Sequence, residues 1–406
     1  MDALLSNVAP LAVLSYLEFS DLCSLRVSSS RCRDATELHA RQILSGNDLV
    51  WALTLSSPRS MLARLYVLTR PRILLMGGNV DSRKVSRFDA ASSKFTTLCT
   101  FSLKRVEAFA CVWHQGRCCA ISGCFDPTLG SVESFNPVLN VWTEAPRLPR
   151  RIDSLAAASD GRSLYVVGGH DHGNRRRSEA IFVLNDGRWD EVAVQLSCGR
   201  SNHAAAFHKG CLWVAGGVLG PRLASPASSS NSSSSSSSSS IGPVATATCE
   251  IVDFRTGTVT FAPPMLKERY QLKMLTIRGR LYAVAGDMAG AESAVNTVEM
   301  FDDTQWRVVT TFPTFRTRCA VAALGGVLYV FGGADERGRA VMDWDAYDVD
   351  SDRWLSMNDA AEAAEGVGSP TRRRALPTRP SSLTAAGGSP QRSGLIGAVA
   401  VTIGST

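Results

Sequence analysis

The sequence predicts an all-β protein built from six similar units, and two observations support this prediction. Six short apolar runs end in a glycine pair or a variant of one, and alternating apolar segments follow each run after a polar loop. The first glycines are separated by 46 (77 to 123), 45 (123 to 168), 48 (168 to 216), 70 (216 to 286) and 46 (286 to 332) residues. A period near fifty residues is typical of propeller blades. The glycines expected to be structural are Gly77, Gly78, Gly123, Gly168, Gly169, Gly216, Gly217, Gly286, Gly332 and Gly333.

Each unit is predicted to be a four-stranded antiparallel meander. Strand A starts at an arginine, strand B ends in the glycine pair, strand C is an alternating run such as 132–137, and strand D contains a bulky residue such as Trp142. Apolar runs of four to eight residues between turn residues are typical of strands. The tryptophans, with Tyr165, Tyr282 and Tyr329, are expected to pack between blades. The sequence therefore predicts a six-bladed β-propeller over residues 71–358.

The two ends of the repeat region are expected to pair. The first glycine-pair strand, 73–78, has no strand A before it, and residues 392–406 read as a strand A with no strand B after it. Pairing them would close the ring and remove a sheet edge. A serine-rich insertion, 221–244, accounts for the long spacing, and the linker 359–391 has a similar low-complexity composition; both are expected to be disordered.

This layout resembles the kelch repeat over residues 70–406. The resemblance implies a β-propeller whose first blade is shared by the two ends of the repeat region. A glycine pair at a strand end permits positive φ and close approach of a neighbouring backbone, so the pairs have a structural explanation. Neither the glycines nor the tryptophans indicate catalysis.

The N-terminal region is expected to form a small helical module over 1–45, followed by a helical linker over 46–70. Leu11, Leu14 and Leu17 form an apolar stripe at helical spacing, and Ser20 precedes a second short helix. Residues 5–33 resemble an F-box, although Ser6, Ser28 and Cys32 depart from its usual residues. The resemblance implies docking on the Skp adaptor of a cullin–RING ubiquitin ligase. The residues carried over are Leu5, Pro10, Leu14, Leu17, Leu22 and Leu25. A helical cap that packs on the propeller without a partner is the alternative.

A substrate protein is expected to bind the face that carries the D-to-A and B-to-C connections. Its predicted residues are Arg105, Arg151, Arg200, Ser201, Asn202, Arg269, Tyr270, Arg318, Arg392, Ser393, His170 and Arg175. In the related BTB–kelch adaptors, serines after the strand A arginine contact an acidic peptide, and Ser201 and Ser393 match that position. Guanidinium groups suit carboxylates and phosphates, so we expect an acidic or phosphorylated partner segment. The alternative for the repeated arginines is structural: they brace adjacent blades by binding backbone carbonyls.

Composition and motifs narrow the function classes. The formal net charge is +6 and the eleven cysteines are scattered, which favours a cytoplasmic or nuclear protein. A membrane span is not expected, since the apolar stretch 8–17 is too short. His114, Cys118, Cys119 and Cys124 are not expected to hold zinc, because alternate strand residues diverge. No cofactor, nucleic-acid partner or enzymatic activity is expected. Three classes compete: a ligase substrate receptor, a kelch scaffold outside any ligase, and, least supported, an enzyme.

Overall fold

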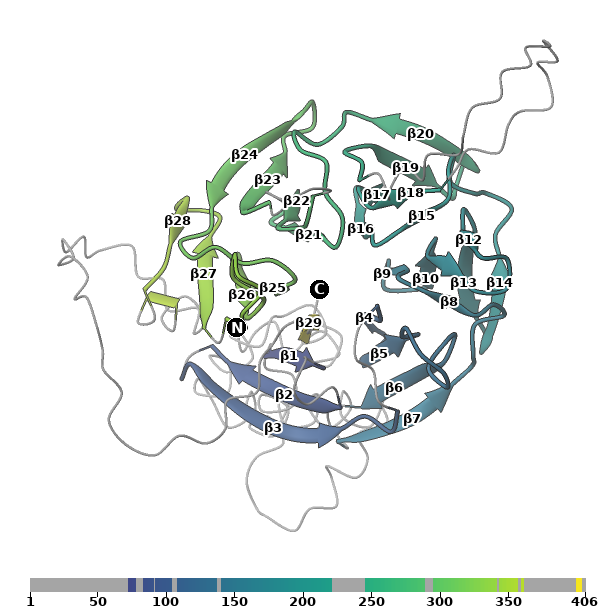
Figure 1. Ribbon diagram of the computed structural model, residues 1–406, viewed down its shortest axis with the longest axis horizontal. Coiled ribbons are helices and arrows are strands. Elements are labelled where there is room, and N and C mark those ends of the chain that lie inside the picture. The colour runs from purple at the N-terminus through teal and green to yellow at the C-terminus, as the bar shows by residue number, and fades with distance from the viewer. Residues whose placement is uncertain are drawn as a thin grey trace, which may run out of the picture. The chain divides into compact units, whose positions relative to one another are not determined.

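The predicted strands form four-stranded antiparallel sheets. The computed structural model describes residues 72–77, 83–90, 92–103, 108–136, 140–220, 245–288, 295–341, 343–356, 359–360 and 399–403. Within this part of the chain, six sheets of four strands stand in a ring, each with one edge strand toward the centre (Figure 1). The predicted helical module and linker, 1–70, lie outside the described residues, as do the serine-rich insertion 221–244 and most of the linker 359–391.

The strands follow one another in chain order, apart from the last. The first sheet has the order β29 (Val399–Ile403), β1 (Arg72–Met76), β2 (Lys84–Asp89), β3 (Lys94–Thr100). The second is β4 (Ala110–His114), β5 (Arg117–Ile121), β6 (Val132–Asn136), β7 (Val141–Ala145). The third is β9 (Ala156–Ser159), β10 (Leu164–Val167), β13 (Ile181–Asn185), β14 (Arg188–Glu191).

The remaining three sheets repeat this order. The fourth is β16 (Ala204–His208), β17 (Cys211–Ala215), β19 (Cys249–Asp253), β20 (Thr258–Ala262). The fifth is β21 (Lys273–Ile277), β22 (Arg280–Val284), β23 (Thr297–Phe301), β24 (Trp306–Thr311). The sixth is β25 (Ala320–Leu324), β26 (Val327–Phe331), β27 (Trp344–Asp348), β28 (Arg353–Trp354). The predicted meander is therefore present in every repeat.

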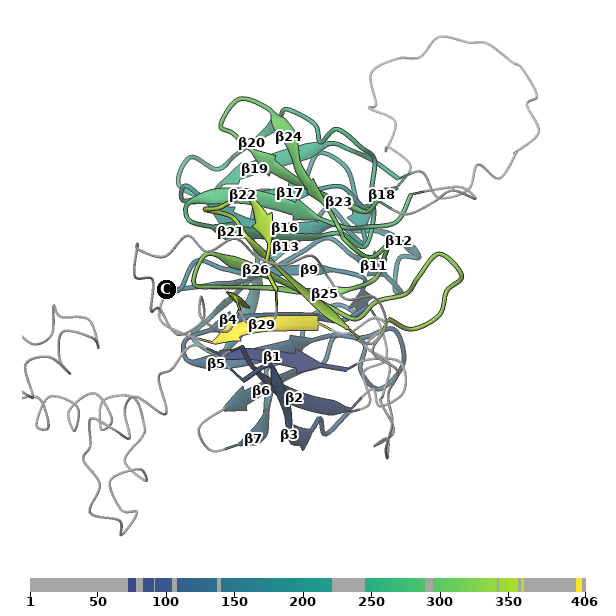
Figure 2. The ribbon, with the colours of Figure 1, turned by 90° about the vertical axis from the view of Figure 1, so that its left-hand side faces the viewer.

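The first sheet combines the two ends of the repeat region. Strand β29 is hydrogen-bonded to β1, so a strand from the C-terminal end supplies the inner edge of the sheet (Figure 2). Pairing at the ring closure was predicted from the missing strand A before 73–78. The strand spans 399–403, a part of the predicted 392–406. The pairing gives β1 a hydrogen-bonded neighbour on its inner side, so that β1 is not an open edge.

The core lies between neighbouring sheets, and β10 shows how the sequence produces it. Its four residues are all buried, and alternate side chains face opposite neighbours. Leu164 and Val166 pack with Ile121 of the second sheet, whereas Tyr165 and Val167 pack with Leu212 of the fourth. Because both faces are covered, the strand is a continuous apolar run rather than an alternating one. Each such aliphatic side chain contributes about 1.5–3 kcal/mol of burial free energy.

The strand D tryptophans fix one sheet to the preceding one, as predicted. The indole N–H of Trp189 donates to the Pro146 carbonyl at 2.7 Å, and that of Trp306 donates to the Pro263 carbonyl at 3.1 Å. Trp354 repeats the contact with the Thr311 carbonyl at 3.0 Å. In each case the acceptor lies in or just after strand D of the previous repeat. These side chains therefore serve packing between sheets.

Candidate partner-binding face

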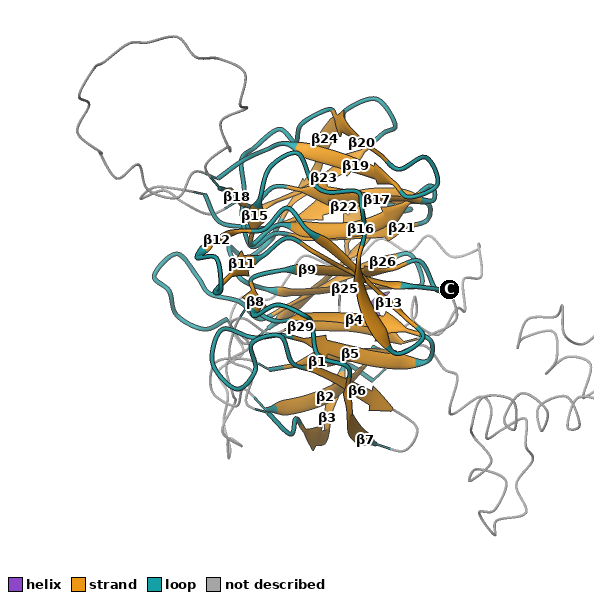
Figure 3. Ribbon diagram, turned by 90° about the vertical axis from the view of Figure 1, so that its right-hand side faces the viewer, coloured by secondary structure: helices purple, strands orange, loops and turns teal. Residues whose placement is uncertain are grey.

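A second, shorter set of strand pairs extends the inner strands beyond the glycine pairs. Strand β8 (Ile152–Asp153) pairs with β11 (His170–Asp171), which also pairs with β12 (Arg176–Arg177), and β15 (Arg200–Ser201) pairs with β18 (Val218–Leu219). Isolated bridges at 270/287 and 317/334 repeat the pattern in the fifth and sixth repeats. We call the side of the ring that bears these pairs the mouth face (Figure 3). The D-to-A and B-to-C connections lie together on it, as the strand directions predicted.

The glycine pairs allow the chain to continue from strand B into these shorter strand pairs. Gly169 has φ of 100°, and a Cβ there would lie 2.5 Å from the Asp153 carbonyl oxygen. At Gly217, with φ of 91°, a Cβ would lie 2.6 Å from the Ser201 carbonyl oxygen. A side chain would thus both strain the backbone and clash with the start of strand A. This close approach accounts for the second glycine of the pair.

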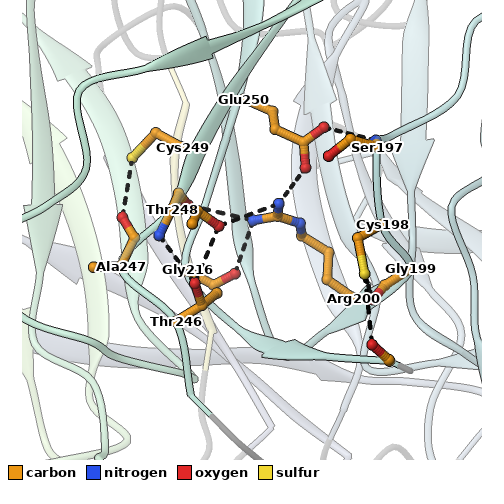
Figure 4. A network of polar contacts seen from close by, with 11 residues as sticks. Ser197, Cys198, Gly199, Arg200, Gly216, Thr246, Ala247, Thr248, Cys249 and Glu250 are labelled. Atoms are coloured by element: carbon orange, nitrogen blue, oxygen red, sulfur yellow. Dashed lines mark hydrogen bonds and ion pairs between the residues drawn. The ribbon is translucent and has the colours of Figure 1, made fainter. Parts of the chain in front are cut away.

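Two of the arginines predicted to bind substrate are buried inside the sheets. The Arg200 side chain is 1% exposed and pairs with Glu250, which is fully buried (Figure 4). Its guanidinium also donates to the carbonyls of Gly216 at 3.1 Å and Thr248 at 3.3 Å. Arg269 is 0% exposed and makes the equivalent pair with Glu299. Their placement on the binding surface was wrong, because a side chain without exposed area contacts no partner.

The guanidinium groups of these arginines bind backbone carbonyls, as the structural alternative expects, but the carbonyls belong to the arginine's own sheet, and the main chain makes the bond to the preceding repeat. The Arg200 carbonyl accepts a hydrogen bond from the Gly169 N–H of the third repeat at 2.8 Å, while its guanidinium binds the fourth sheet. The Arg269 carbonyl likewise accepts from Gly217 at 2.8 Å. Each arginine therefore joins its own sheet to the preceding repeat. In the sixth sheet Arg316 makes the equivalent guanidinium contacts, pairing with Asp345 at 2.6 Å and donating to the Gly332 carbonyl at 3.3 Å.

Arg318, which was predicted among the substrate-binding arginines, does not stand at this repeated position. Arg316 lies sixteen residues before Gly332, the same offset that separates Arg200 from Gly216. Arg318 is 47% exposed on the mouth face, and its Nε lies 3.3 Å from an Asp287 carboxylate oxygen. Two positions after the buried arginine, it is thus a surface residue whose charge is already partnered.

Three further predicted residues lie on the mouth face and are partly or fully buried or hydrogen-bonded within the protein. Ser201 is 4% exposed, and its hydroxyl accepts from Arg177 Nε at 3.1 Å. Asn202 has φ of 54°, and its carbonyl accepts from the Gln271 N–H of the next repeat at 2.7 Å. Tyr270 is half-buried, and burial raises the pKa of its phenol. Ser201 is therefore not presented as the peptide-binding serine that the resemblance implied.

Other predicted residues do reach solvent. Arg151 is 59% exposed and forms an ion pair with Asp126, and Arg175 is exposed in the β11–β12 turn with φ of 53°. The His170 ring is half-buried, and its centroid lies 5.1 Å from that of His172. His172 Nε2 is 2.9 Å from an Asp153 carboxylate oxygen. Arg105, Arg392, Ser393 and the six residues predicted for adaptor docking lie outside the described residues.

The sequence reasoning did not foresee that acids of this face pair with its arginines, or that an aromatic ring is exposed there. Arg150 lies 2.7 Å from Glu191, and Arg339 lies 2.7 Å from Asp335. Phe125, beside the Arg151–Asp126 pair, is 65% exposed. The mouth face is thus a mosaic of ion pairs with one protruding ring, rather than the arginine-rich surface expected.

A cavity of about 150 Å³ lies between the inner strands β4, β9, β16, β21 and β25. His203, Lys273 and Cys111 contribute its polar lining. Burial, and then the nearby Arg200 charge, lower the pKa of His203 to about 3, so its imidazole is neutral at physiological pH. Within the described ranges, no cluster of three or more His, Cys, Asp or Glu side chains is arranged to hold a metal ion. The same residues contain no helix long and apolar enough to cross a membrane.

Comparisons with known proteins match two of the repeats to a known sequence motif. A profile of the kelch motif matches residues 268–313 and 316–359. The chain carries kelch repeats. It is 31% identical over 171 residues to spermatocyte protein spe-26 of Caenorhabditis elegans. The aligned residues cover 39% of this chain and 30% of that protein. An F-box/kelch-repeat protein of Arabidopsis thaliana is 36% identical over 110 residues, 24% of this chain and 26% of that protein.

Two further matches, one to a sequence and one to a solved structure, cover more of the chain. Kelch-like protein 23 of Homo sapiens is 22% identical over 289 residues, covering 61% of this chain and 49% of that protein. The chain thus spans at most about half of these relatives. The solved structure of YjhT superposes with a TM-score of 0.57 at 12% identity, covering 71% of this chain and 94% of that one. At that identity the likeness establishes the fold alone: an all-β chain of four-stranded sheets arranged as in a kelch propeller.

Proposed function

We propose that residues 71–358, with the closing strand, form a six-bladed propeller that binds a partner protein across the mouth face and performs no catalysis. The observation that carries this proposal is the mouth face itself. There the chain leaves the repeated pattern and exposes Phe125, Arg151 and Arg175 on loops held by a rigid ring. Exposed loop side chains on a rigid framework are typical of recognition surfaces. The kelch-like relatives support an interaction role.

The proposed partner segment is acidic or phosphorylated. Arg175 and Arg337 are exposed on B-to-C loops, and neither forms an ion pair with a described residue. Their guanidinium groups could bind carboxylate or phosphate oxygens of a partner. Phe125 would provide an apolar contact near the same rim, since large exposed aromatic residues often dominate binding free energy.

We further propose that the N-terminal segment recruits the Skp adaptor and a cullin, which would make the protein a substrate receptor of a ubiquitin ligase in the cytoplasm or nucleus. Support comes from the F-box-like residues Leu14, Leu17, Leu22 and Leu25 and from the F-box/kelch-repeat relative. Leucines on one helical face supply most of the free energy of a helix-in-groove interface. A charge placed among them would be costly to bury.

The test is copurification from cells with a matched pair of variants. Leu14→Asp with Leu17→Asp should abolish recovery of the Skp adaptor and cullin, whereas Leu68→Asp, outside the F-box-like segment, should not. Recovery of partners of the mouth face should be unchanged in both. If the wild-type protein never recovers the adaptor while the propeller still binds a protein, the ligase role fails and a scaffold role replaces it.

A further inference from the structure

Three sulfur atoms meet where the first and second sheets face each other. The Cys111 thiol lies 3.5 Å from the thioether sulfur of Met76, and the Cys118 thiol lies 3.7 Å from the same atom. Met76 belongs to β1, whereas Cys111 and Cys118 belong to β4 and β5. Met76 and Cys118 are 0% exposed. Cys111 lines the central cavity, so the cluster has a route to a water-accessible space.

The register of β4 and β5 explains how the two thiols converge. Cys111 is opposite Ala120, and Cys118 is opposite Trp113, so both cysteines lie on the same face of the sheet. Cys119, the next residue, faces the other way, packing with Leu164 of the third sheet. The expectation that consecutive cysteines diverge is therefore correct for Cys118 and Cys119. The third donor was missed because it is a methionine from another sheet.

We propose that Met76, Cys111 and Cys118 form a binding site for a monovalent soft metal ion, Cu(I). Thiolate and thioether sulfurs are the ligands that Cu(I) prefers. With metal–sulfur bonds of about 2.3 Å, as in zinc thiolates, a trigonal site would separate its sulfurs by about 4 Å. The two separations above, 3.5 and 3.7 Å, need only a small expansion to accept an ion.

The charges and protons of binding can be assigned to named groups. Cu(I) would displace one proton from each thiol, giving a complex with two thiolates, one thioether and a net charge of −1. Burial, and then the adjacent Cys111 thiol, raise the pKa of Cys118 well above its ordinary value, so that thiol is protonated without the metal. Lys273, across the cavity on β21, interacts electrostatically with Cys111 and would offset the charge of the complex. Binding involves no change of oxidation state when the metal is supplied as Cu(I).

The competing explanation is packing alone, since methionine sulfur commonly fills core gaps. The two explanations differ in what the site does with a soft ion. A bound ion would link β1 of the first sheet to β4 and β5 of the second, and would therefore stabilise the region where the ring closes. This inference stands independently of the proposed partner binding.

The test is anaerobic competition between the full-length protein and a chromophoric Cu(I) chelator. We expect one Cu(I) per chain that the chelator removes only at high excess. Met76→Leu and Cys111→Ser should each weaken binding by at least about tenfold, by analogy with the effect of losing ligand-supporting groups. Cys119→Ser is the matched control, because it removes a buried thiol from the same strand on the opposite face, and it should bind as the wild type does.

Two further readouts separate a specific site from surface thiol chemistry. Cu(I) should raise the melting temperature of the wild-type protein and of Cys119→Ser but not of Met76→Leu, whose own melting temperature without metal establishes that it folds. X-ray absorption should report sulfur-only coordination at about 2.3 Å. If Met76→Leu and Cys111→Ser bind Cu(I) as tightly as Cys119→Ser, or if the wild type binds none in competition, the site does not exist.

Discussion

Exchanging the buried ion pair Arg200–Glu250 for apolar residues tests why the fourth sheet carries charge in its interior. The third sheet supplies the replacement, because Ile152 and Phe182 stand at the equivalent positions and are 0% and 1% exposed. Ile152 precedes Gly168 by the sixteen residues that separate Arg200 from Gly216. The same position in the fold thus accepts either a buried ion pair or two apolar side chains. The perturbation is Arg200→Ile with Glu250→Phe, compared with each single variant.

The expected magnitudes follow from burial and partners. Arg200→Ile leaves a carboxylate with no exposed surface and only the Ser197 N–H, at 2.8 Å, as a charge-stabilising donor. Removing one partner of a buried pair costs about 3–5 kcal/mol, because the other charge remains buried without compensation. The double variant removes both charges and loses hydrogen bonds to the Gly216 and Thr248 carbonyls, each worth about 1 kcal/mol. We expect it to lose about 1–2 kcal/mol, less than either single variant.

Urea denaturation monitored by tryptophan fluorescence would measure the three free energies of unfolding. A negative coupling between the two substitutions is the prediction, with the double variant more stable than both singles. A double variant whose loss equals the sum of the single losses would refute the reasoning, since the two groups would then not interact. A single-variant loss below about 1 kcal/mol would also refute it, because it would mean that the charges are solvated.

Three other predictions test different regions. Burial, and then a neighbouring guanidinium, lower the pKa of His203 to about 3. The contribution of His203 to stability is therefore fully present above pH 6.5 and is lost by about 1.4 kcal/mol per pH unit as the pH falls toward 3. His203→Leu should make the free energy of unfolding, measured in denaturation curves, less dependent on pH in this range. Deleting 392–406 should expose the edge of β1 and cause aggregation or loss of a cooperative melt; a soluble deletion variant with unchanged melting temperature would contradict ring closure. Arg175→Glu with Arg337→Glu should weaken, in a salt-sensitive manner, binding of an acidic partner peptide, whereas Arg255→Glu on a C-to-D turn should not, and equal weakening would exclude the mouth face.

The repeat architecture could be predicted because each unit carries the same local signals. The glycine at 169 is required by a backbone approach that recurs in other repeats, and strand B is apolar throughout because neighbouring sheets cover both faces. Trp189, Trp306 and Trp354 recur at one position because each donates to the preceding repeat. Signals of this kind are local in sequence and repeated along the chain. Sequence reasoning therefore identified the strands, their order and the pairing of the two ends.

The binding face was predicted less well because exposure depends on contacts that the repeat pattern does not encode. An arginine at the start of strand A has the same sequence appearance whether its side chain points outward or inward. Arg200 and Arg269 point inward because Glu250, the second residue of β19, and Glu299, the third residue of β23, lie buried opposite them. Reading the two positions together would have separated these arginines from Arg151, since the third repeat has Phe182 instead of an acid.

The buried arginine–acid pairs also limit which side chains could determine the choice of partner. The strand A arginines of the fourth, fifth and sixth sheets are engaged with the acids and carbonyls of their own sheets, so they hold the ring in a fixed geometry. If a partner binds the mouth face as proposed, its recognition would depend on the exposed side chains of the connecting loops, which differ from one repeat to the next. The loop at 171–178 forms a short hairpin with exposed Arg175, and the loop at 334–341 presents Arg337. Substitutions in these loops should change partner choice without changing stability, whereas substitutions of the buried arginines should do the reverse.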